Sequence, residues 1–316
     1  MDERVNGSMD FGDSERSRWA IILAGGDGRR LTSYTRQLTG RPTPKQFCRL
    51  IGRTSLFQQT MERLSLIVGS DHTLTALTRT HEPYYAPLIA NLSPRQLVIQ
   101  PANRDTAPAI LYCLLRLSLR APQAPVALIP SDRFVSDDHL FMWHVERAFR
   151  AVCRQDDLIV LLGIPPETAE TGYGWIEPAP DPIFAANPIY PVRGFWEKPS
   201  AELAQELFAR QCLWNSFVVV ARVHTLLHVF EDKLPQLSRD FVRVLLALET
   251  EYESQAVERL YRRLQPANFS QRILAHPGLN LVVLPVYGVQ WSDLGDARRV
   301  MQTLCRVRNQ GSCDDG

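Results

Sequence analysis

Short apolar runs alternate with longer amphipathic stretches through the first half of the chain. The runs within 19–26, 95–101, 125–132 and 157–164 end at glycine or polar residues, which predicts buried strands. The stretches 54–64, 103–120 and 141–153 place apolar residues at helical spacing or nearly all round, which predicts helices between those strands. This alternation predicts an α/β protein with a mostly parallel sheet and helices on both faces. Ligands of such sheets lie beyond the carboxyl ends of the strands.

The pattern changes after residue 163. Residues 171–178 and 192–199 are short strand-like pieces joined by a proline-rich surface excursion, and 214–221 is a further strand. Residues 224–264 are mainly helical with charged faces. A strand at 279–286 either closes the sheet or starts a small one, and 296–308 predicts a last helix. We expect the basic side chains of that helix, Arg298, Arg299, Arg306 and Arg308, to form a solvated face.

The charge balance excludes a global attraction to polyanions. The chain of 316 residues carries 35 basic and 34 acidic side chains, so we expect neither nucleic acid nor a membrane as partner, and any phosphate binding must be local. The six cysteines lack C-x-x-C spacing, so they give no sign of a cysteine-ligated metal site or of a disulfide framework. Residues 1–17 are polar and predict a disordered leader rather than a signal peptide. The expected location is the cytoplasm.

The stretch "LAGGDGRRL", Leu23 to Leu31, follows the first predicted strand. It lacks the third glycine of the dinucleotide fingerprint, and the G-K-[ST] of the Walker loop is absent from the chain. Glycines at a strand end let backbone N–H groups approach an anion, with Arg29 and Arg30 at hand. The loop therefore indicates a phosphorylated ligand, although a glycine-rich turn with solvated arginines fits the loop alone equally well.

Two aspartates follow apolar strands. Asp132 comes after "VALIPS", and Asp293 stands in "VQWSDLGD" before a helix. A carboxylate at the carboxyl end of a buried strand is a suitable Mg²⁺ ligand. Taken singly, each aspartate is better explained as an Asx turn or a helix cap than as a metal ligand. Lys45 and Lys198 each stand beside a proline that stiffens the backbone.

The chain resembles the sugar-1-phosphate nucleotidyltransferases, and most closely the mannose-1-phosphate guanylyltransferases. The similarity runs from about Trp19 to Arg306, through eight motifs in the family's order: "LAGGDGRRL", "PKQF", "NRDTAPA", "IPSD", "TGYGWIE", "EKP", "WNS" and "WSDLG". It implies a three-layer Rossmann-like fold with a mostly parallel mixed sheet and a small, largely helical C-terminal part. It also implies one domain over 18–308, divided into a nucleotide-binding part (about 18–163) and a sugar-phosphate part with C-terminal helices (about 164–308), before a polar tail at 309–316.

The resemblance also assigns roles to matching residues. The catalytic residues it implies are Arg30, Lys45, Asp132 and Asp293, with Asp132 and Asp293 converging on Mg²⁺. The triphosphate and base would be bound by Leu23, Ala24, Gly25, Gly26, Gly28, Arg30, Lys45, Gln100, Arg104, Asp105 and Thr106. The sugar phosphate would be bound by Gly172, Glu197, Lys198 and Asn215. Arg29 is expected to be a solvated neighbour.

The implied reaction transfers a nucleotidyl group from a nucleoside triphosphate, with GTP expected, to a hexose-1-phosphate, with mannose-1-phosphate expected. The products are a nucleotide sugar and pyrophosphate. One alternative is the same chemistry with UTP, CTP or dTTP and glucose-1-phosphate. Another is a sensor that binds a nucleotide sugar without turnover. The sequence leaves the oligomeric state open, with a homodimer as one candidate.

Several positions depart from the family pattern. The segment between Arg30 and Lys45 is a longer polar loop without the family's early proline. Arg133 stands where the family usually carries histidine, Asp105 replaces an asparagine, and Phe217 replaces a glycine. Ser270 and Ala275 stand where the family usually has acidic residues. Arg133 therefore adds a positive charge beside the expected metal site.

Overall fold

A computed structural model describes residues 18–184 and 188–311 of the chain. The leader expected at 1–17 lies outside the described residues, as do the last five residues of the expected tail. In the part of the chain that is described, no helix is both long enough and apolar enough to cross a membrane.

A nine-stranded mixed sheet forms the centre of the molecule, in the order β3-β2-β1-β4-β9-β6-β10-β8-β7. Strands β3, β2, β1 and β4 run parallel, and β6 and β10 run parallel to each other. Strand β9 is antiparallel to both β4 and β6, so these two groups point the same way. The strand bounds are β1 (Trp19–Leu23), β2 (Thr73–Thr78), β3 (Leu97–Gln100), β4 (Pro125–Pro130), β6 (Ile159–Ile164), β7 (Gly174–Pro178), β8 (Tyr190–Glu197), β9 (Leu213–Arg222) and β10 (Leu281–Pro285).

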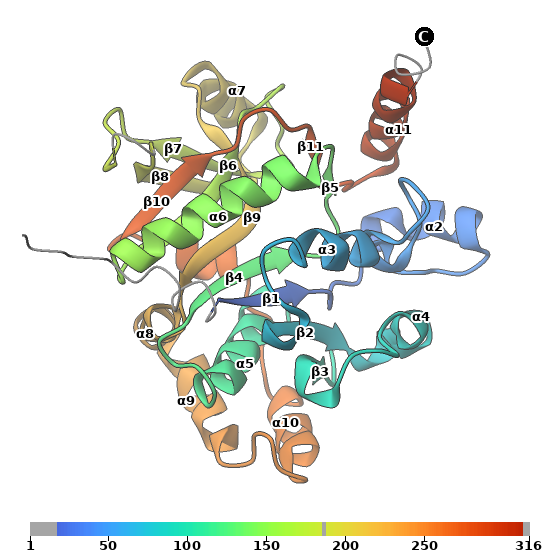
Figure 1. Cartoon of the computed structure of the whole chain (residues 1–316), viewed down its shortest axis with the longest axis vertical. Coiled ribbons are helices and arrows are strands. Elements are labelled where there is room, and N and C mark those ends of the chain that lie inside the picture. Colours follow the sequence, from blue (N-terminus) through green and yellow to red (C-terminus); the bar gives the residue numbers. More distant parts are fainter. Residues whose placement is uncertain (1–17, 185–187, 312–316) are drawn as a thin grey trace, which may run out of the picture.

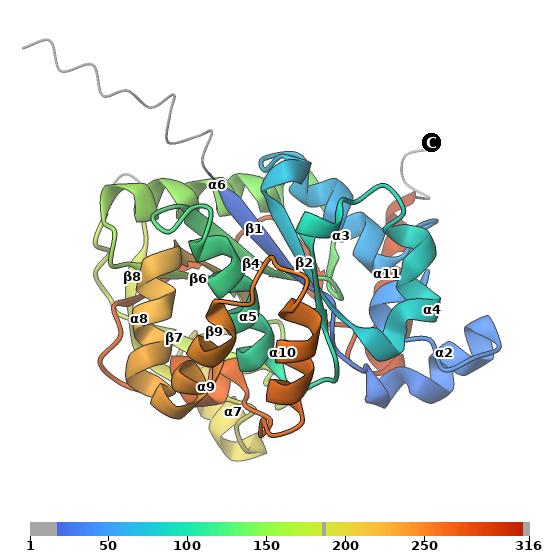
Figure 2. The same cartoon turned by 90° about the horizontal axis from the view of Figure 1, so that it is seen from below.

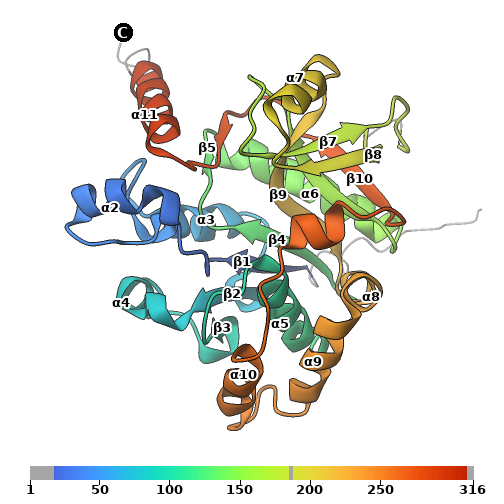
Figure 3. The same cartoon turned by 180° about the vertical axis from the view of Figure 1, so that it is seen from behind.

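Helices cover both faces of the sheet. In β1, Ile21 packs into the core on one face and Ile22 into the core on the other, as period-two alternation requires. One face carries α3 (Leu56–Leu64) and α6 (Asp138–Arg154) (Figure 1). Helix α7 (Ala201–Ala209) adds Ala204 and Leu207 to the same apolar cluster. The opposite face carries α5 (Thr106–Ser118), α8 (Val223–Lys233), α9 (Pro235–Leu245) and α10 (Glu253–Tyr261) (Figure 3). Figure 2 shows α6 and these four helices on opposite sides of the strands. The predicted three-layer α/β fold is confirmed.

The segment predicted as a polar loop between Arg30 and Lys45 contains a helix, α2 (Thr32–Thr39). The helix buries only Thr35 and ends at Gly40, which has a φ of 76°. Because so little of α2 is buried, its apolar pattern is weak, and the prediction of a loop was wrong for these residues. A short helix, α4 (Glu82–Tyr85), follows β2. A π-helical turn spans Ser270–Leu274.

A second, two-stranded sheet joins distant parts of the chain. Strand β5 (Phe134–Val135) pairs with β11 (Trp291–Ser292), with Phe134 opposite Ser292. This pairing places the residues just before β5 beside the residues just after β11. The last helix, α11 (Ala297–Gly311), starts soon after β11. Strand β10 lies within the main sheet, which decides between the two placements that the sequence left open.

Candidate active site

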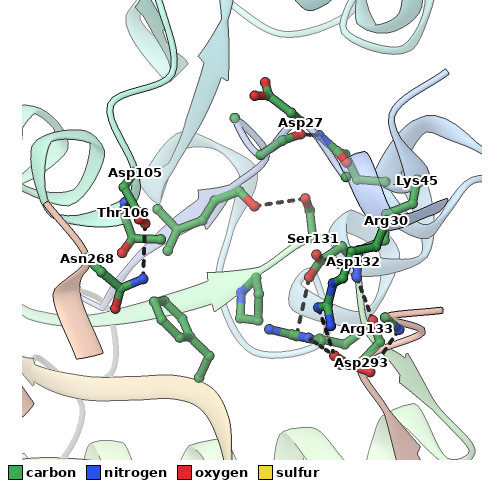
Figure 4. Close-up of a pocket in the computed structure, with 18 of the residues that line it drawn as sticks. Asp27, Arg30, Lys45, Asp105, Thr106, Ser131, Asp132, Arg133, Asn268 and Asp293 are labelled. Carbon is green, nitrogen blue, oxygen red and sulfur yellow. Dashed lines mark hydrogen bonds and ion pairs between the residues drawn. The ribbon is translucent and has the colours of Figure 1, made fainter. Parts of the chain in front are cut away.

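One cavity of about 730 Å³ lies beyond the carboxyl ends of β1 and β4. Figure 4 shows two groups of side chains on its walls, one around Asp132 and Asp293 and one around Asp105 and Asn268. The cavity brings together all the predicted site residues except two, Ala24 and Arg104. Those that line it are Leu23, Gly25, Gly26, Gly28, Arg30, Lys45, Gln100, Asp105, Thr106, Asp132, Gly172, Glu197, Lys198, Asn215 and Asp293.

The glycine loop after β1 is held tightly in place. Gly28 has a φ of 62°, in the left-handed region that glycine adopts without strain. At Gly25 a Cβ atom would stand 2.8 Å from Nε2 of Gln100 and 2.9 Å from Oγ1 of Thr78, so any other residue would require these side chains to shift. The Gln46 amide donates hydrogen bonds to the carbonyls of Ala24 (3.0 Å) and Gly26 (2.8 Å). The loop backbone therefore faces the cavity in a fixed shape.

Asp132 and Asp293 meet because β5 and β11 pair. Lys45 links them: its Nζ lies 3.0 Å from Oδ2 of Asp132 and donates to the Asp293 carbonyl at 2.5 Å. Burial lowers the pKa of Lys45 more than the nearby carboxylates raise it. For Asp132, burial alone would raise the pKa, but Arg133 and Lys45 outweigh it and hold the pKa below its ordinary value. Asp132 is thus held in its ionised form.

Asp293 is the more deeply buried carboxylate, with 4% of its side chain exposed against 27% for Asp132. Its Oδ1 lies 2.7 Å from Nη1 of Arg299 and accepts from the Gly295 N–H at 2.8 Å. Burial would raise its pKa, but Arg133, Lys45 and Arg299 together hold the pKa of Asp293 below its ordinary value. Positive side chains thus surround both carboxylates (Figure 4).

Arg299 is buried, which contradicts its expected place on a solvated face of the last helix. Its guanidinium also pairs with Glu170 at 2.8 Å and lies 4.4 Å from the centre of the Tyr173 ring. Because these partners come from other elements, helical spacing alone could not reveal the burial. The neighbouring Arg298 is exposed, as expected.

The second end of the cavity is built at the start of α5. Asp105 caps the helix through a hydrogen bond from the Thr106 N–H to Oδ1 (2.7 Å), and Nδ2 of Asn268 donates to the same oxygen (3.1 Å). Asp105 has a φ of 66°, which is unusual for a residue other than glycine. Gln100 accepts a hydrogen bond from the Tyr261 hydroxyl (3.1 Å). Neither Asn268 nor Tyr261 was predicted, because Tyr261 ends the distant helix α10 and Asn268 lies in the irregular segment that follows it.

Arg104 does not belong to this group of cavity residues. Its Nε donates to the Tyr261 carbonyl at 3.1 Å, and the side chain is not part of the cavity wall. Ala24 is almost fully buried in the core beneath the glycine loop. A direct contact between either side chain and a ligand is therefore not supported by the geometry.

The third wall comes from β8 and β9. Nζ of Lys198 lies 3.4 Å from Oε1 of Glu197, and its side chain is half exposed. Asn215 lines the cavity from β9, and its Oδ1 accepts from the Phe217 N–H at 3.0 Å. Phe217 also lines the cavity and has a φ of 66°. A bulky side chain in this region is strained, so a residue at the cavity wall stores conformational energy.

The chain is similar to known proteins over most of its length. The family described as nucleotidyl transferase matches residues 19–310. The alginate biosynthesis protein AlgA of Pseudomonas aeruginosa is 30% identical over 72% of this chain and 46% of its own length. Mannose-1-phosphate guanylyltransferase of Escherichia coli is 29% identical over 64% of this chain and 42% of its own length. This chain thus spans about half the length of these curated relatives.

A solved structure shares both sequence and fold with the chain. It is described as a mannose-1-phosphate geranyltransferase from Thermus thermophilus, and it is 27% identical with a TM-score of 0.77. The match covers 90% of this chain and 79% of that one.

Proposed function

Because the chain belongs to the nucleotidyl transferase family, we propose that it transfers a nucleotidyl group from a nucleoside triphosphate to a hexose-1-phosphate, with GTP and mannose-1-phosphate as its substrates. One observation carries the proposal. A single cavity joins the glycine loop, the Asp132 and Asp293 carboxylates, and the group formed by Glu197, Lys198 and Asn215. Such a cavity can hold two anionic substrates side by side.

The chemistry needs positioning and charge more than proton transfer. An oxygen of the sugar phosphate attacks the α-phosphorus, the bond to the bridging oxygen breaks, and pyrophosphate leaves with the electron pair. The attacking oxygen is already ionised at neutral pH, so no general base is required. The residues must bring two anions together and stabilise the charge that develops on the leaving group. We assign Arg30 and Lys45 to the triphosphate and Lys198 to the phosphate of the sugar.

Guanine recognition is assigned to Asp105. Its Oδ1 is occupied by the Thr106 N–H and by Asn268. Its other carboxylate oxygen, Oδ2, makes no hydrogen bond to a described residue and is therefore open to a ligand. The Asp105 side chain lines the cavity. A carboxylate oxygen can accept from the N1–H and the amino group of guanine, which uracil, cytosine and thymine do not present in this pattern. Relatives named mannose-1-phosphate guanylyltransferase support the same choice.

Mg²⁺ is part of the proposal, with Asp132 and Asp293 as its protein ligands. Among the described residues no group of three or more His, Cys, Asp or Glu side chains could hold a metal ion. Two carboxylates nevertheless fit Mg²⁺, because this ion is commonly bound by one or two carboxylates together with substrate phosphates. When bound, the ion would supply charge neutralisation at the phosphates.

The test is pyrophosphate release by the purified chain with Mg²⁺. GTP, ATP, UTP, CTP and dTTP are each combined with mannose-1-phosphate and with glucose-1-phosphate. We expect release with GTP and mannose-1-phosphate, and a loss of release in Asp132→Ala. Release only with another pair would keep the reaction and overturn the assigned substrates. Nucleotide binding without release for any pair would overturn the reaction and favour a nucleotide-sugar sensor.

A further inference from the structure

Arg133 lies against both carboxylates of the proposed metal site. It follows Asp132 directly and precedes β5, and its guanidinium lies 5.6 Å from the centre of the Trp291 ring. Its Nε is 3.3 Å from Oδ1 of Asp132, and its Nη1 is 3.7 Å from Oδ2 of Asp293. One positive group therefore spans two carboxylates that come from segments far apart in the sequence.

The remaining carboxylate oxygens also face basic side chains. Lys45 approaches Oδ2 of Asp132, and Arg299 approaches Oδ1 of Asp293. Arg30 lies more loosely, at 3.8 Å from Oδ2 of Asp293. A magnesium ion needs its oxygen ligands at about 2.0–2.1 Å. A divalent ion therefore competes for these oxygens with positive charges that belong to the protein itself.

Arg133 is the competitor whose displacement would release both carboxylates, because the more exposed Arg30 contacts Asp293 alone. Lys45 and Arg299 are each less than a tenth exposed and make close contacts at 3.0 Å or less with their carboxylates. Arg133 is 20% exposed and makes only the two longer contacts with them. Its Nε is buried and has no hydrogen-bond partner among the described residues. A charged donor in this state gains from meeting an acceptor such as a phosphate oxygen.

We propose that Arg133 is a positioning residue that pairs with Asp132 and Asp293 until a triphosphate arrives. Arg133 would then weaken the binding of free divalent ions. When the triphosphate binds, the guanidinium would pair with phosphate oxygens and leave Asp132 and Asp293 free to hold the ion. This inference rests on the proposed function in assuming a triphosphate ligand. It adds an order of events: the protein favours the metal–nucleotide complex over the free metal.

Binding of Mn²⁺ without nucleotide tests the first half of the proposal. The ion is titrated into wild type, Arg133→Gln and Arg150→Gln, and free Mn²⁺ is measured by electron paramagnetic resonance. Arg150 is a matched control because it is an exposed arginine on α6 that pairs with Glu146. We expect Mn²⁺ to bind Arg133→Gln at least tenfold more tightly than wild type, with Arg150→Gln unchanged. Equal affinity in wild type and Arg133→Gln, including undetectable binding in both, overturns the proposal.

Nucleotide binding tests the second half. With a chelator present, we expect GTP to bind Arg133→Gln at least fivefold more weakly than wild type, because the phosphates lose the guanidinium. Equal GTP affinity in wild type and Arg133→Gln would refute the proposal that the Arg133 guanidinium pairs with the phosphates. Arg133→Lys keeps the positive charge but lacks the planar guanidinium, so its affinities should fall between those of wild type and Arg133→Gln in both titrations. It replaces Arg133→Gln in these tests if that variant does not fold. Neither titration needs turnover, so a gain in Mn²⁺ affinity beside absent pyrophosphate release would refute only the proposed reaction.

Discussion

Replacing the two carboxylates one at a time should separate catalysis from stability. Asp132→Ala and Asp293→Ala each remove one proposed ligand of the metal and of the surrounding cations. We expect both variants to lose activity by a factor on the order of 10² or more, because both lose charge stabilisation at the phosphates. Their stabilities should differ, since their burial differs.

The difference follows from what each substitution leaves behind. Asp293→Ala removes the partner of Arg299, whose side chain is only 7% exposed, and the acceptor of the Gly295 N–H. Breaking a buried ion pair lowers the free energy of unfolding by about 3–5 kcal/mol. Because Glu170 still pairs with Arg299 in this variant, we expect a loss at the lower end, about 3 kcal/mol. Asp132→Ala leaves Lys45 its bond to the Asp293 carbonyl, and the lost carboxylate was partly exposed. We expect Asp132→Ala to lower the free energy of unfolding by about 1 kcal/mol.

Thermal unfolding measures the contrast. A chain of this size shifts its Tm by roughly 2 °C per kcal/mol, so we expect a loss of about 6 °C for Asp293→Ala and about 2 °C for Asp132→Ala. Asp293→Asn is the matched control, because an amide oxygen can still accept from Gly295, and it should recover part of the loss. Equal Tm values for the two alanine variants would refute the argument that Arg299 depends on Asp293.

Three further predictions address the loop, the core and the sugar pocket. Gly28→Ala should lower the free energy of unfolding in urea by about 1–2 kcal/mol, because Gly28 has a φ of 62° and the new Cβ would lie 3.2 Å from the backbone nitrogen of Lys45. At Gly26 a Cβ would meet nothing within 4 Å, so an equal loss in Gly26→Ala would contradict this reasoning. Burial holds the pKa of His144 below its ordinary value of 6.5, so the imidazole stays neutral in the fold and stability should fall as pH drops below about 6.5. His144→Gln should show a shallower fall between about pH 7.5 and 5.5, and an unchanged slope would assign the titration to other groups. Lys198→Ala should raise the KM for the sugar phosphate about tenfold. A change confined to the KM for the triphosphate would show that Lys198 binds the triphosphate instead.

The layers of the fold could be predicted because the main strands are apolar runs and the helices that cover them carry apolar residues at helical spacing. Asp132 was found for the same reason, since it directly follows a buried strand. The pairing of β5 with β11 could not be predicted, because each strand has two residues and the contact joins segments that are far apart along the chain. The convergence of Asp132 and Asp293 was therefore inferred only from family resemblance, and the structure supplies its physical cause.

The burial of Arg299 was missed for a related reason. The sequence around it reads as a charged helix, and a charged helix usually faces water. Its partners Asp293 and Glu170 lie on other segments, so only their three-dimensional arrangement turns this arginine inward. Asn268 was missed likewise, because its contact with Asp105 depends on how the irregular segment after α10 returns to the start of α5.

The position of Arg133 over the Trp291 ring gives the site an optical reporter of its own. Indole emission responds to a nearby positive charge, so moving the guanidinium from the ring to a phosphate changes the fluorescence of this tryptophan. Trp291→Phe removes that response and leaves the emission of the other five tryptophans as the background to subtract. Arrival of the nucleotide can thus be followed in real time, without a label and before any bond is broken.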